Sequence, residues 1–237
     1  MLSPGLEKIG IQIGRDKFFD LLRANGLLVK RRKNYAVTTQ SYHHFKVYRN
    51  LIKGWQPSRP GQLWVSDITY MRTVKGFVYL FLITDAYSRK VVGWHLSDSL
   101  GIEGALRALK MALRQCKTTR DLIHHSDRGI QYCCKAYVEQ LNKYGVKISM
   151  AATGDCYENA LAERVNGILK DEYCLDSTFQ SYNNAQKATA SAVKLYNEYR
   201  PHWSLGLQIP SIVHEKPNSY PLINVETKRK KNQKRKT

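Results

Sequence analysis

Three segments in the first half of the chain are rich in β-branched and aromatic residues, and short polar connections separate them. These segments cover residues 63–71, 77–87 and 90–96, with Lys75-Gly76 and Ser88-Arg89 between them. Val, Ile, Tyr, Phe and Trp are enriched in strands, and short connections favour hairpins. The pattern therefore predicts three consecutive antiparallel strands.

The spacing of apolar residues becomes helical after residue 101, with Leu106, Leu109 and Leu113 on one face of a helix over 102–116. Strands are then predicted over 122–125 and 146–150, and helices near 135–144, 159–173 and 182–199. A strand that is reached through a helical crossover tends to lie parallel to its neighbour. We therefore expect a mixed α/β sheet. If the strand before Asp127 lies beside the first strand, Asp127 comes close to Asp67.

A separate helix is predicted near the N-terminus, within residues 14–33, ending near Asn25-Gly26. Its apolar side carries Phe18, Phe19, Leu21 and Leu22, and a basic stretch follows, made of Lys30, Arg31, Arg32 and Lys33. A small helical DNA-binding module and a surface helix with a solvated basic end both explain this pattern. Residues 53–61, KGWQPSRPG, carry two prolines and two glycines, which predicts a linker.

The composition indicates a folded protein that binds a polyanion. The chain has 237 residues, 43% of them hydrophobic, and a formal net charge of +19. Seven positive charges belong to the last ten residues, an expected disordered tail, and without these seven the charge of +19 falls only to +12. Nucleic acid is the partner that such a charge favours, because the sequence shows no basic amphipathic helix with a wide apolar face.

The sequence also points to the cytoplasm. It lacks a secretory pattern and an apolar run long enough to span a membrane, so we expect no membrane partner. Five scattered cysteines without a CxxC pair are typical of reduced thiols rather than of disulfides or a zinc site.

Three carboxylates are candidates for chemistry. Asp67 lies inside an apolar strand, where an uncompensated charge is costly, and Asp127 ends the strand in LIHHSDRGIQY. A helical projection at about 100° per residue places Glu163 on the face opposite the apolar stripe, in line with Asn159, Asn166 and Lys170. Each carboxylate also has a simpler explanation, namely a turn for either aspartate and an exposed helix charge for Glu163.

The three carboxylates together suit a pair of hard divalent cations. Mg²⁺ prefers oxygen ligands and keeps open positions for water and phosphate oxygens. Two such ions about 3.5–4 Å apart can stabilise both the attacking and the leaving oxygen of a phosphodiester.

Four motifs resemble the catalytic core of DDE transposases and retroviral-type integrases. They are WVSDITY, HSDRGIQY and YENALAERVNGILKDE, with 35 residues between Asp127 and Glu163, and YNEYRPHWSLG near the C-terminus. The sequence is most similar to the second-reading-frame transposases of the insertion-sequence-three family, from about Gly14 to His214.

This resemblance implies a ribonuclease-H-like mixed sheet flanked by helices, preceded by a small helix-turn-helix-like module. It implies Asp67, Asp127 and Glu163 as catalytic, metal-binding residues, with Mg²⁺ as cofactor and Mn²⁺ as a substitute. The implied reaction is cleavage at transposon ends followed by DNA strand transfer, with one end attacking the other to form a circular intermediate. Lys170 matches a position where related enzymes place a basic residue against end DNA, and Arg128, Gln131 and Asn159 match positions around the metals.

Four parts are expected along the chain: an N-terminal helical DNA-binding module over 1–53, a linker over 54–61, the catalytic core over 62–215 and the basic tail over 216–237. DNA-binding residues are expected in the N-terminal module and in the catalytic core. They are Lys30, Arg31, Arg32, Lys33, Arg128, Gln131, Asn159, Asn166 and Lys170. The expected partners are double-stranded DNA, as transposon end and target, and further copies of the chain on that DNA. When bound to DNA the protein would be associated with the bacterial nucleoid.

The N-terminal part departs from the family, because relatives usually carry another helix before residues 15–25. Either the reading frame is truncated or the upstream-frame protein of the same element supplies the missing part. In the C-terminal motif, we expect Tyr196 and Trp203 to pack a helix end on the core, and weigh direct DNA contact by Tyr196, Arg200 and His202 as the alternative.

Two other functions share some of these features. A ribonuclease H would have the same carboxylates and fold but would not need the basic N-terminal stretch or Lys170. A degenerate protein that binds transposon ends and represses transposition would be expected to have lost an acidic residue, and all three are present.

Overall fold

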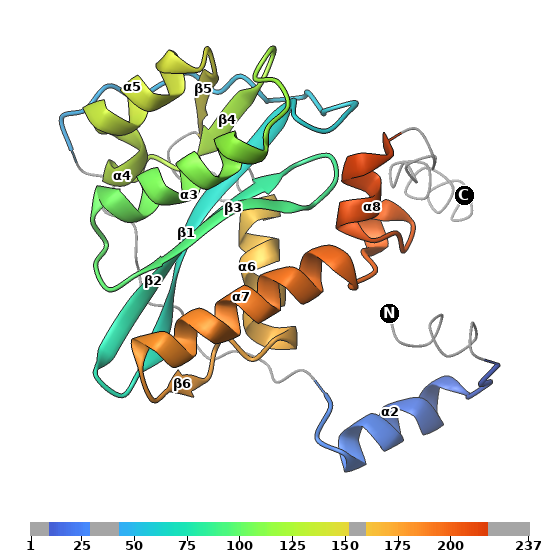
Figure 1. Cartoon of the computed structure of the whole chain (residues 1–237). Coiled ribbons are helices and arrows are strands. Elements are labelled where there is room, and N and C mark those ends of the chain that lie inside the picture. Colours follow the sequence, from blue (N-terminus) through green and yellow to red (C-terminus); the bar gives the residue numbers. More distant parts are fainter. Residues whose placement is uncertain (1–9, 29–42, 152–159, 218–237) are drawn as a thin grey trace, which may run out of the picture.

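A mixed β-sheet forms the centre of the protein, and helices cover both of its faces (Figure 1). The computed structural model describes residues 10–28, 43–151 and 160–217. Within these ranges the strand order is β3-β2-β1-β4-β5, and the short β6 pairs with β1. The strands are β1 (Leu63–Thr73), β2 (Gly76–Asp85), β3 (Val91–Ser97), β4 (Ile123–Ser126), β5 (Lys147–Met150) and β6 (Thr178–Phe179).

The predicted topology is confirmed. β1, β2 and β3 are antiparallel neighbours, with Asp67 opposite Leu82 in the first pair. β4 lies parallel to β1, and β5 lies parallel to β4. A helical crossover precedes each of β4 and β5, which explains their parallel direction.

Two hydrophobic cores lie on opposite faces of the sheet because side chains alternate along each strand. On one face Trp64 of β1 and Phe81 of β2 pack with α3 and α5, and on the other Met71 and Leu80 pack with α6 and α7. The helices that cover the sheet are α3 (Ile102–Gln115), α4 (Ile130–Cys133), α5 (Lys135–Lys143), α6 (Ala160–Glu172) and α7 (Tyr182–Glu198). The short α4 was not predicted.

Two glycines allow α3 to lie directly on the sheet. A Cβ atom at Gly93 of β3 would come within 2.3 Å of the Ala108 carbonyl oxygen, and one at Gly104 of α3 would come within 2.3 Å of the Phe81 ring. Neither position tolerates a side chain without movement of the helix.

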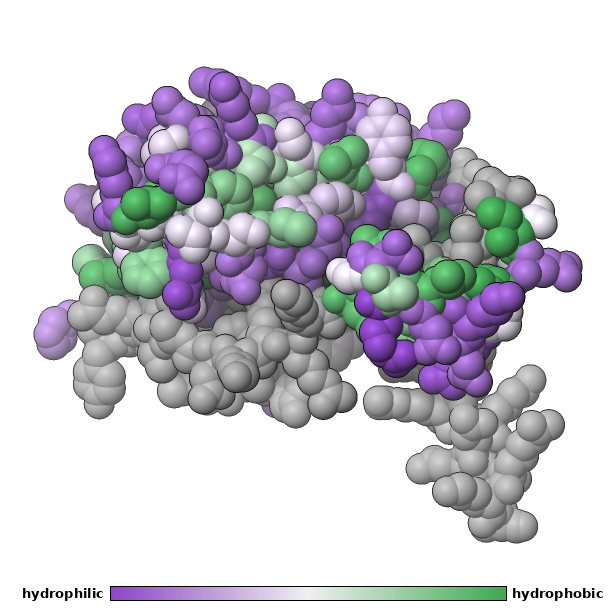
Figure 2. Space-filling view, turned by 90° about the horizontal axis from the view of Figure 1, so that it is seen from below, coloured by the Kyte–Doolittle hydropathy of each residue, from purple (hydrophilic) through white to green (hydrophobic). Residues whose placement is uncertain are grey.

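The predicted N-terminal helix forms as α2 (Arg15–Ala24), ending at Asn25, and stands apart from the sheet in Figure 1. Its apolar residues are not buried: Phe19 is 43% exposed and Leu21 48%. Figure 2, which views the molecule from the side of α2, shows hydrophobic side chains exposed among hydrophilic ones. α2 therefore has an apolar side without packing it on the core.

Residues 43–52, on the N-terminal side of the predicted linker, contact the core. His43 Nε2 lies 2.8 Å from the Arg128 carbonyl oxygen, and the Leu51 amide donates to Ser149 Oγ at 2.9 Å. Tyr48 packs against the core of the α3 face. The domain boundaries stay predictions, and the N-terminal module, if it is separate, would end before this segment.

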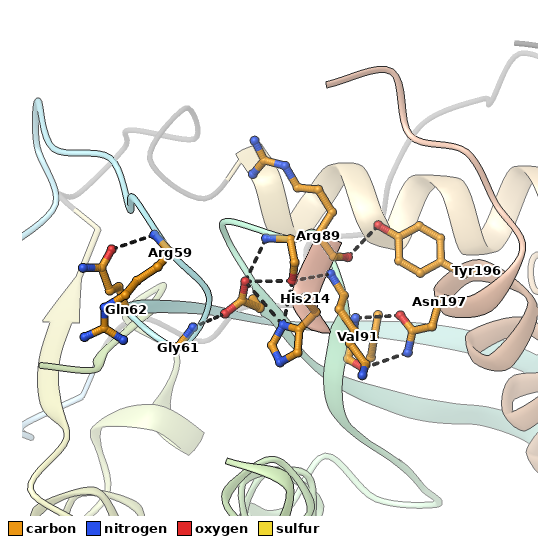
Figure 3. Close-up of polar contacts among 11 residues, drawn as sticks. Arg59, Gly61, Gln62, Arg89, Val91, Tyr196, Asn197 and His214 are labelled. Carbon is orange, nitrogen blue, oxygen red and sulfur yellow. Dashed lines mark hydrogen bonds and ion pairs between the residues drawn. The ribbon is translucent and has the colours of Figure 1, made fainter. Parts of the chain in front are cut away.

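The C-terminal motif fastens α7 to the hairpin between β2 and β3 (Figure 3). Asn197 forms two hydrogen bonds with the backbone of Val91, each of 2.9 Å, and Tyr196 donates its hydroxyl to the Arg89 carbonyl oxygen at 2.9 Å. Tyr196 is fully buried, as predicted, but the expected packing of Trp203 is wrong: this side chain is 64% exposed. It lies in the 3-10 turn η2 (Trp203–Leu205), which was not predicted, and neither was α8 (Pro210–Glu215).

Candidate functional site

Asp67 and Asp127 are brought side by side by the pairing of β1 with β4. Val65 pairs with His125 in the parallel ladder, and each aspartate stands two residues further on, Asp67 within β1 and Asp127 directly after β4. Two residues along a strand return a side chain to the same face. The expected adjacency of the two aspartates therefore follows from the observed register.

Glu163 is an exposed residue of α6, which packs along β1, and it lies close enough for its charge to raise the pKa of Asp67. Asn166, one helical turn later, donates from Nδ2 to Asp67 Oδ2 at 2.6 Å. Lys170, another turn later, places its ammonium 4.4 Å from the centre of the Tyr70 ring. Asn166 and Lys170 therefore lie on one face of α6, as predicted, but this face packs against β1. Each of the two residues is only 6% exposed.

The pKa of Asp67 shows that the carboxylates interact. Burial is the largest cause that raises this pKa from its usual 3.8 to about 7, and the negative charges of Asp127 and Glu163 contribute to the same rise. The hydrogen bond from Asn166 opposes the shift. A divalent cation would reverse it, because positive charge favours the ionised carboxylate.

Asp127 opens a tight turn as well as facing Asp67. Its Oδ1 accepts the amide of Gly129 at 2.9 Å. A Cβ atom on Gly129 would lie 3.0 Å from that same oxygen and 3.2 Å from Gln131 Oε1. The turn therefore positions the Asp127 carboxylate, and a side chain at Gly129 would displace that carboxylate by a few tenths of an ångström.

Arg128 and Gln131 both hold the loops around Asp127. Arg128 Nε donates to the Ala151 carbonyl oxygen and Gln131 Nε2 to that of Leu100, each at 2.8 Å. Their DNA contacts stay predictions, as do those of Asn166 and Lys170. Asn159 and the basic stretch Lys30, Arg31, Arg32 and Lys33 lie outside the described residues.

His124 belongs to the sheet interior. It is buried, its Nε2 lies 2.7 Å from Ser66 Oγ and 2.9 Å from the Tyr137 hydroxyl, and burial lowers its pKa to about 3. His125 is equally buried, with Nδ1 2.8 Å from Ser149 Oγ.

A buried aspartate that the sequence did not single out lies at the end of β2. Asp85 accepts hydrogen bonds from the Gly61 amide, at 2.8 Å, and from the amide and hydroxyl of Ser88, each at 2.8 Å. His214 Nδ1 lies 2.9 Å from the same hydroxyl, so the cluster ties α8 to the hairpin (Figure 3). The sequence does contain a signal for this cluster, because Asp85 is a carboxylate at the end of an apolar strand, as Asp127 is.

The donor set suits Mg²⁺, although the carboxylates are not gathered into a closed cage. In the three ranges that the structure describes, no group of three acidic, histidine or cysteine side chains could hold one ion. Mg²⁺ typically uses one or two carboxylates together with waters and substrate phosphates, so a pair such as Asp67 and Asp127 meets its needs.

Sequence comparison identifies the family. Residues 57–156 and 144–210 match two families that are both described as integrase core domains. The chain is 36% identical to the insertion element IS600 uncharacterized 31 kDa protein of Shigella sonnei, over 91% of this chain and 80% of that protein. It is also 36% identical to transposase InsF for insertion sequence IS3A of Escherichia coli, over 78% of this chain and 66% of that one.

The chain belongs to the IS3 family of transposases. Its enzyme class is that of the DDE transposases and integrases, which transfer DNA strands. No helix in the described part of this transposase is long and apolar enough to cross a membrane.

Solved structures confirm the ribonuclease-H-like fold of the transposase. The HTLV-2 integrase catalytic core domain, solved in complex with magnesium, aligns with a TM-score of 0.52 at 20% identity, over 70% of this chain and 99% of that one. A chain of the simian T-cell lymphotropic virus intasome aligns with a TM-score of 0.58 at 17% identity, over 94% of this chain and 74% of that one.

Proposed function

We propose that this transposase cleaves DNA at the ends of its insertion sequence and joins the freed 3′ ends to a second DNA site, with Asp67, Asp127 and Glu163 as its catalytic carboxylates. The observation that carries the proposal is the position of Asp67 beside Asp127 on the paired β1 and β4, within electrostatic range of Glu163 on α6. The charges of Asp127 and Glu163 both act on the pKa of Asp67. A carboxylate whose pKa is raised by burial and by neighbouring negative charges, as that of Asp67 is, is typical of catalytic sites.

Asp67, Asp127 and Glu163 would hold Mg²⁺, or Mn²⁺ in its place. When bound there, the metal supplies electrostatic stabilisation of the attacking and leaving oxygens of a phosphodiester. Asn166 would keep Asp67 oriented by the 2.6 Å hydrogen bond, and the Gly129 amide would do the same for Asp127. Because one phosphodiester bond forms as another breaks, the joining step needs no nucleotide.

The proposed partner is double-stranded DNA, both as transposon end and as target. Lys170, Asn166, Asn159, Arg128, Gln131 and the basic stretch of residues 30–33 are proposed to contact it. We further propose that several copies assemble on the DNA in the bacterial cytoplasm, at the nucleoid, since a solved relative is an intasome. The upstream-frame protein of the element is a candidate partner for the α2 region.

The test incubates the full chain with a labelled duplex of the transposon end in Mg²⁺, Mn²⁺ or EDTA. We expect a new 3′-OH and joined strands only with metal. Asp127→Asn should reduce cleavage by a factor of about a thousand or more and leave DNA affinity nearly unchanged, because it removes a metal ligand and not a phosphate contact.

Asp121→Asn is the matched control, since Asp121 is an exposed carboxylate on the turn before β4. Cleavage by Asp127→Asn at the wild-type rate would refute the carboxylate assignment. Metal-independent binding without any cleavage would instead support the repressor alternative.

A further inference from the structure

A cavity of about 370 Å³ lies beside the first turn of α6 and outside the carboxylate site. Its walls come from five parts of the chain: the segment before β1, the start of β1, the hairpin between β2 and β3, the first turn of α6, and η2. The wall residues that matter here are Trp55, Leu63, Tyr87, Arg89, Leu161 and Ser204.

The cavity lies on the same side of the sheet as the carboxylates. Leu63 and Asp67 are four residues apart on β1, so their side chains point to the same face, about 13 Å from each other along the strand. Leu161 precedes Glu163 by two residues on α6. A distance of about 13 Å corresponds to roughly four base pairs of duplex DNA.

Arg89 brings hydrogen-bond donors to the cavity, and within the described ranges only its Nε is used. Its Nε donates to Ser204 Oγ at 3.2 Å, and its guanidinium points away from the contacts that its backbone makes with Tyr196 (Figure 3). Among the described residues, no carboxylate forms an ion pair with it. Burial lowers the pKa of Arg89, which means that this cation is also poorly hydrated.

The rest of the lining includes the aromatic Trp55 and the apolar Leu63 and Leu161, and the surroundings are cationic. Trp55 is 39% exposed although it lines the cavity. Positive charges on Arg200, Arg89 and Arg164 all lower the pKa of the neighbouring His202, which burial and these charges bring to about 4. A phosphate would use Arg89 and leave Trp55 unused, whereas a nucleobase offers both a ring face and acceptor atoms.

We propose that this cavity takes one base of the end DNA, rotated out of the helix within about four base pairs of the cleaved phosphate, with its ring on Trp55 and its polar edge toward Arg89. The proposal rests on the proposed function, since it places end DNA at the carboxylates. The site would fix the position of the DNA strand relative to the carboxylates.

The test measures binding of the full chain, in EDTA, to end duplexes that carry a single mismatch at each of the first four pairs beside the cleavage position. We expect one mismatch position to tighten binding about ten-fold, because the cost of unpairing that base is removed beforehand. Trp55→Ala should abolish this gain and Trp55→Phe should keep it, since a phenyl ring still stacks. Arg89→Gln should reduce the gain about three-fold. This variant replaces Trp55→Ala in the test if Trp55→Ala does not fold.

Trp203→Ala is the matched control, because Trp203 is a more exposed tryptophan that does not line the cavity. The proposal is overturned if no mismatch position tightens binding, or if the gain survives in Trp55→Ala. It is also overturned if Trp55→Ala changes only self-association, which would assign the cavity to a second copy. Failure of the proposed function is separate and appears as absence of Mg²⁺-dependent cleavage of the fully paired duplex.

Discussion

The carboxylate of Asp127 accepts a hydrogen bond from the backbone of Gly129, and a methyl group on Gly129 would lie 3.0 Å from that carboxylate oxygen, which would then have to shift. We expect Gly129→Ala to lower the cleavage rate about ten-fold, because displacement of a catalytic group by a fraction of an ångström is costly. The change should leave the free energy of unfolding nearly unchanged, since the backbone of Gly129 has an ordinary negative φ.

Gly167→Ala is the control for this prediction, because a Cβ atom there would meet nothing within 4 Å. Cleavage rates of both variants are measured on the same end duplex. Equal rates would show that the Asp127 carboxylate can shift without loss.

Asp67 makes the stability of the metal-free protein depend on pH. Its pKa is about 7 in the folded state against 3.8 as the usual value, so the folded state holds the proton more tightly. Stability is therefore greatest below about pH 4 for this group and is lost as the pH rises to about 7. We expect Asp67→Asn to raise the free energy of unfolding by about 1–2 kcal/mol more at pH 8 than at pH 5.

Stabilisation by Mg²⁺ should increase with pH, whereas the stability that Asp67 gives to the metal-free protein decreases with pH. In the wild type Mg²⁺ should raise Tm more at pH 8 than at pH 5, because it binds the ionised form, and in Asp67→Asn this difference should be much smaller. Calorimetry with and without Mg²⁺ measures both effects. A Tm response to Mg²⁺ that is equal in the two proteins would argue against Asp67 as a ligand.

At the scale of elements, the residues of the C-terminal motif hold helices in place and do not belong to the carboxylate site. Arg200 is buried and forms two hydrogen bonds of 2.6 Å with the carboxylate of Glu172, the last residue of α6. Asn197 pairs with the backbone of Val91 as an additional strand would. These contacts fix α6, which carries Glu163, against α7 and the sheet.

We expect Arg200→Met to lower the free energy of unfolding by about 2–3 kcal/mol, because it leaves the Glu172 carboxylate without its partner. The double variant with Glu172→Gln should recover part of that loss. Urea unfolding measures both, and Arg107→Met, which breaks the exposed pair with Glu103, should cost less than about 0.5 kcal/mol. A loss for Arg200→Met no larger than for Arg107→Met would contradict the assigned role.

At the scale of the whole molecule, the net charge of +19 governs the approach to DNA. Deleting residues 228–237, which carry seven of the positive charges, should weaken DNA binding and make it less dependent on salt. The slope of log affinity against log salt should fall by about 0.9 for each phosphate contact that is lost. Titrations at several salt concentrations measure this slope, and an unchanged slope would show that the tail does not contact DNA.

The sequence by itself determined the local elements of this transposase and the identity of its candidate residues. Strand-like and helical periodicity gave β1 to β5, α3, α5, α6 and α7 nearly as observed, because each buries a regular apolar stripe. The short α4, β6, η2 and α8 were missed, since elements of so few residues carry no periodic signal. The motifs likewise identified the family, because they reside in contiguous residues.

Only the tertiary structure decided what those residues touch. The β1–β4 register put Asp67 beside Asp127, and packing of α6 turned Asn166 and Lys170 from an expected open face into buried contacts. Trp203, expected in the core, is exposed, whereas Asp85 is buried with its hydrogen bonds satisfied by residues distant in sequence. These outcomes depend on which segments pack together in the tertiary structure. The sequence around an apolar or charged residue does not show which distant residues it will contact.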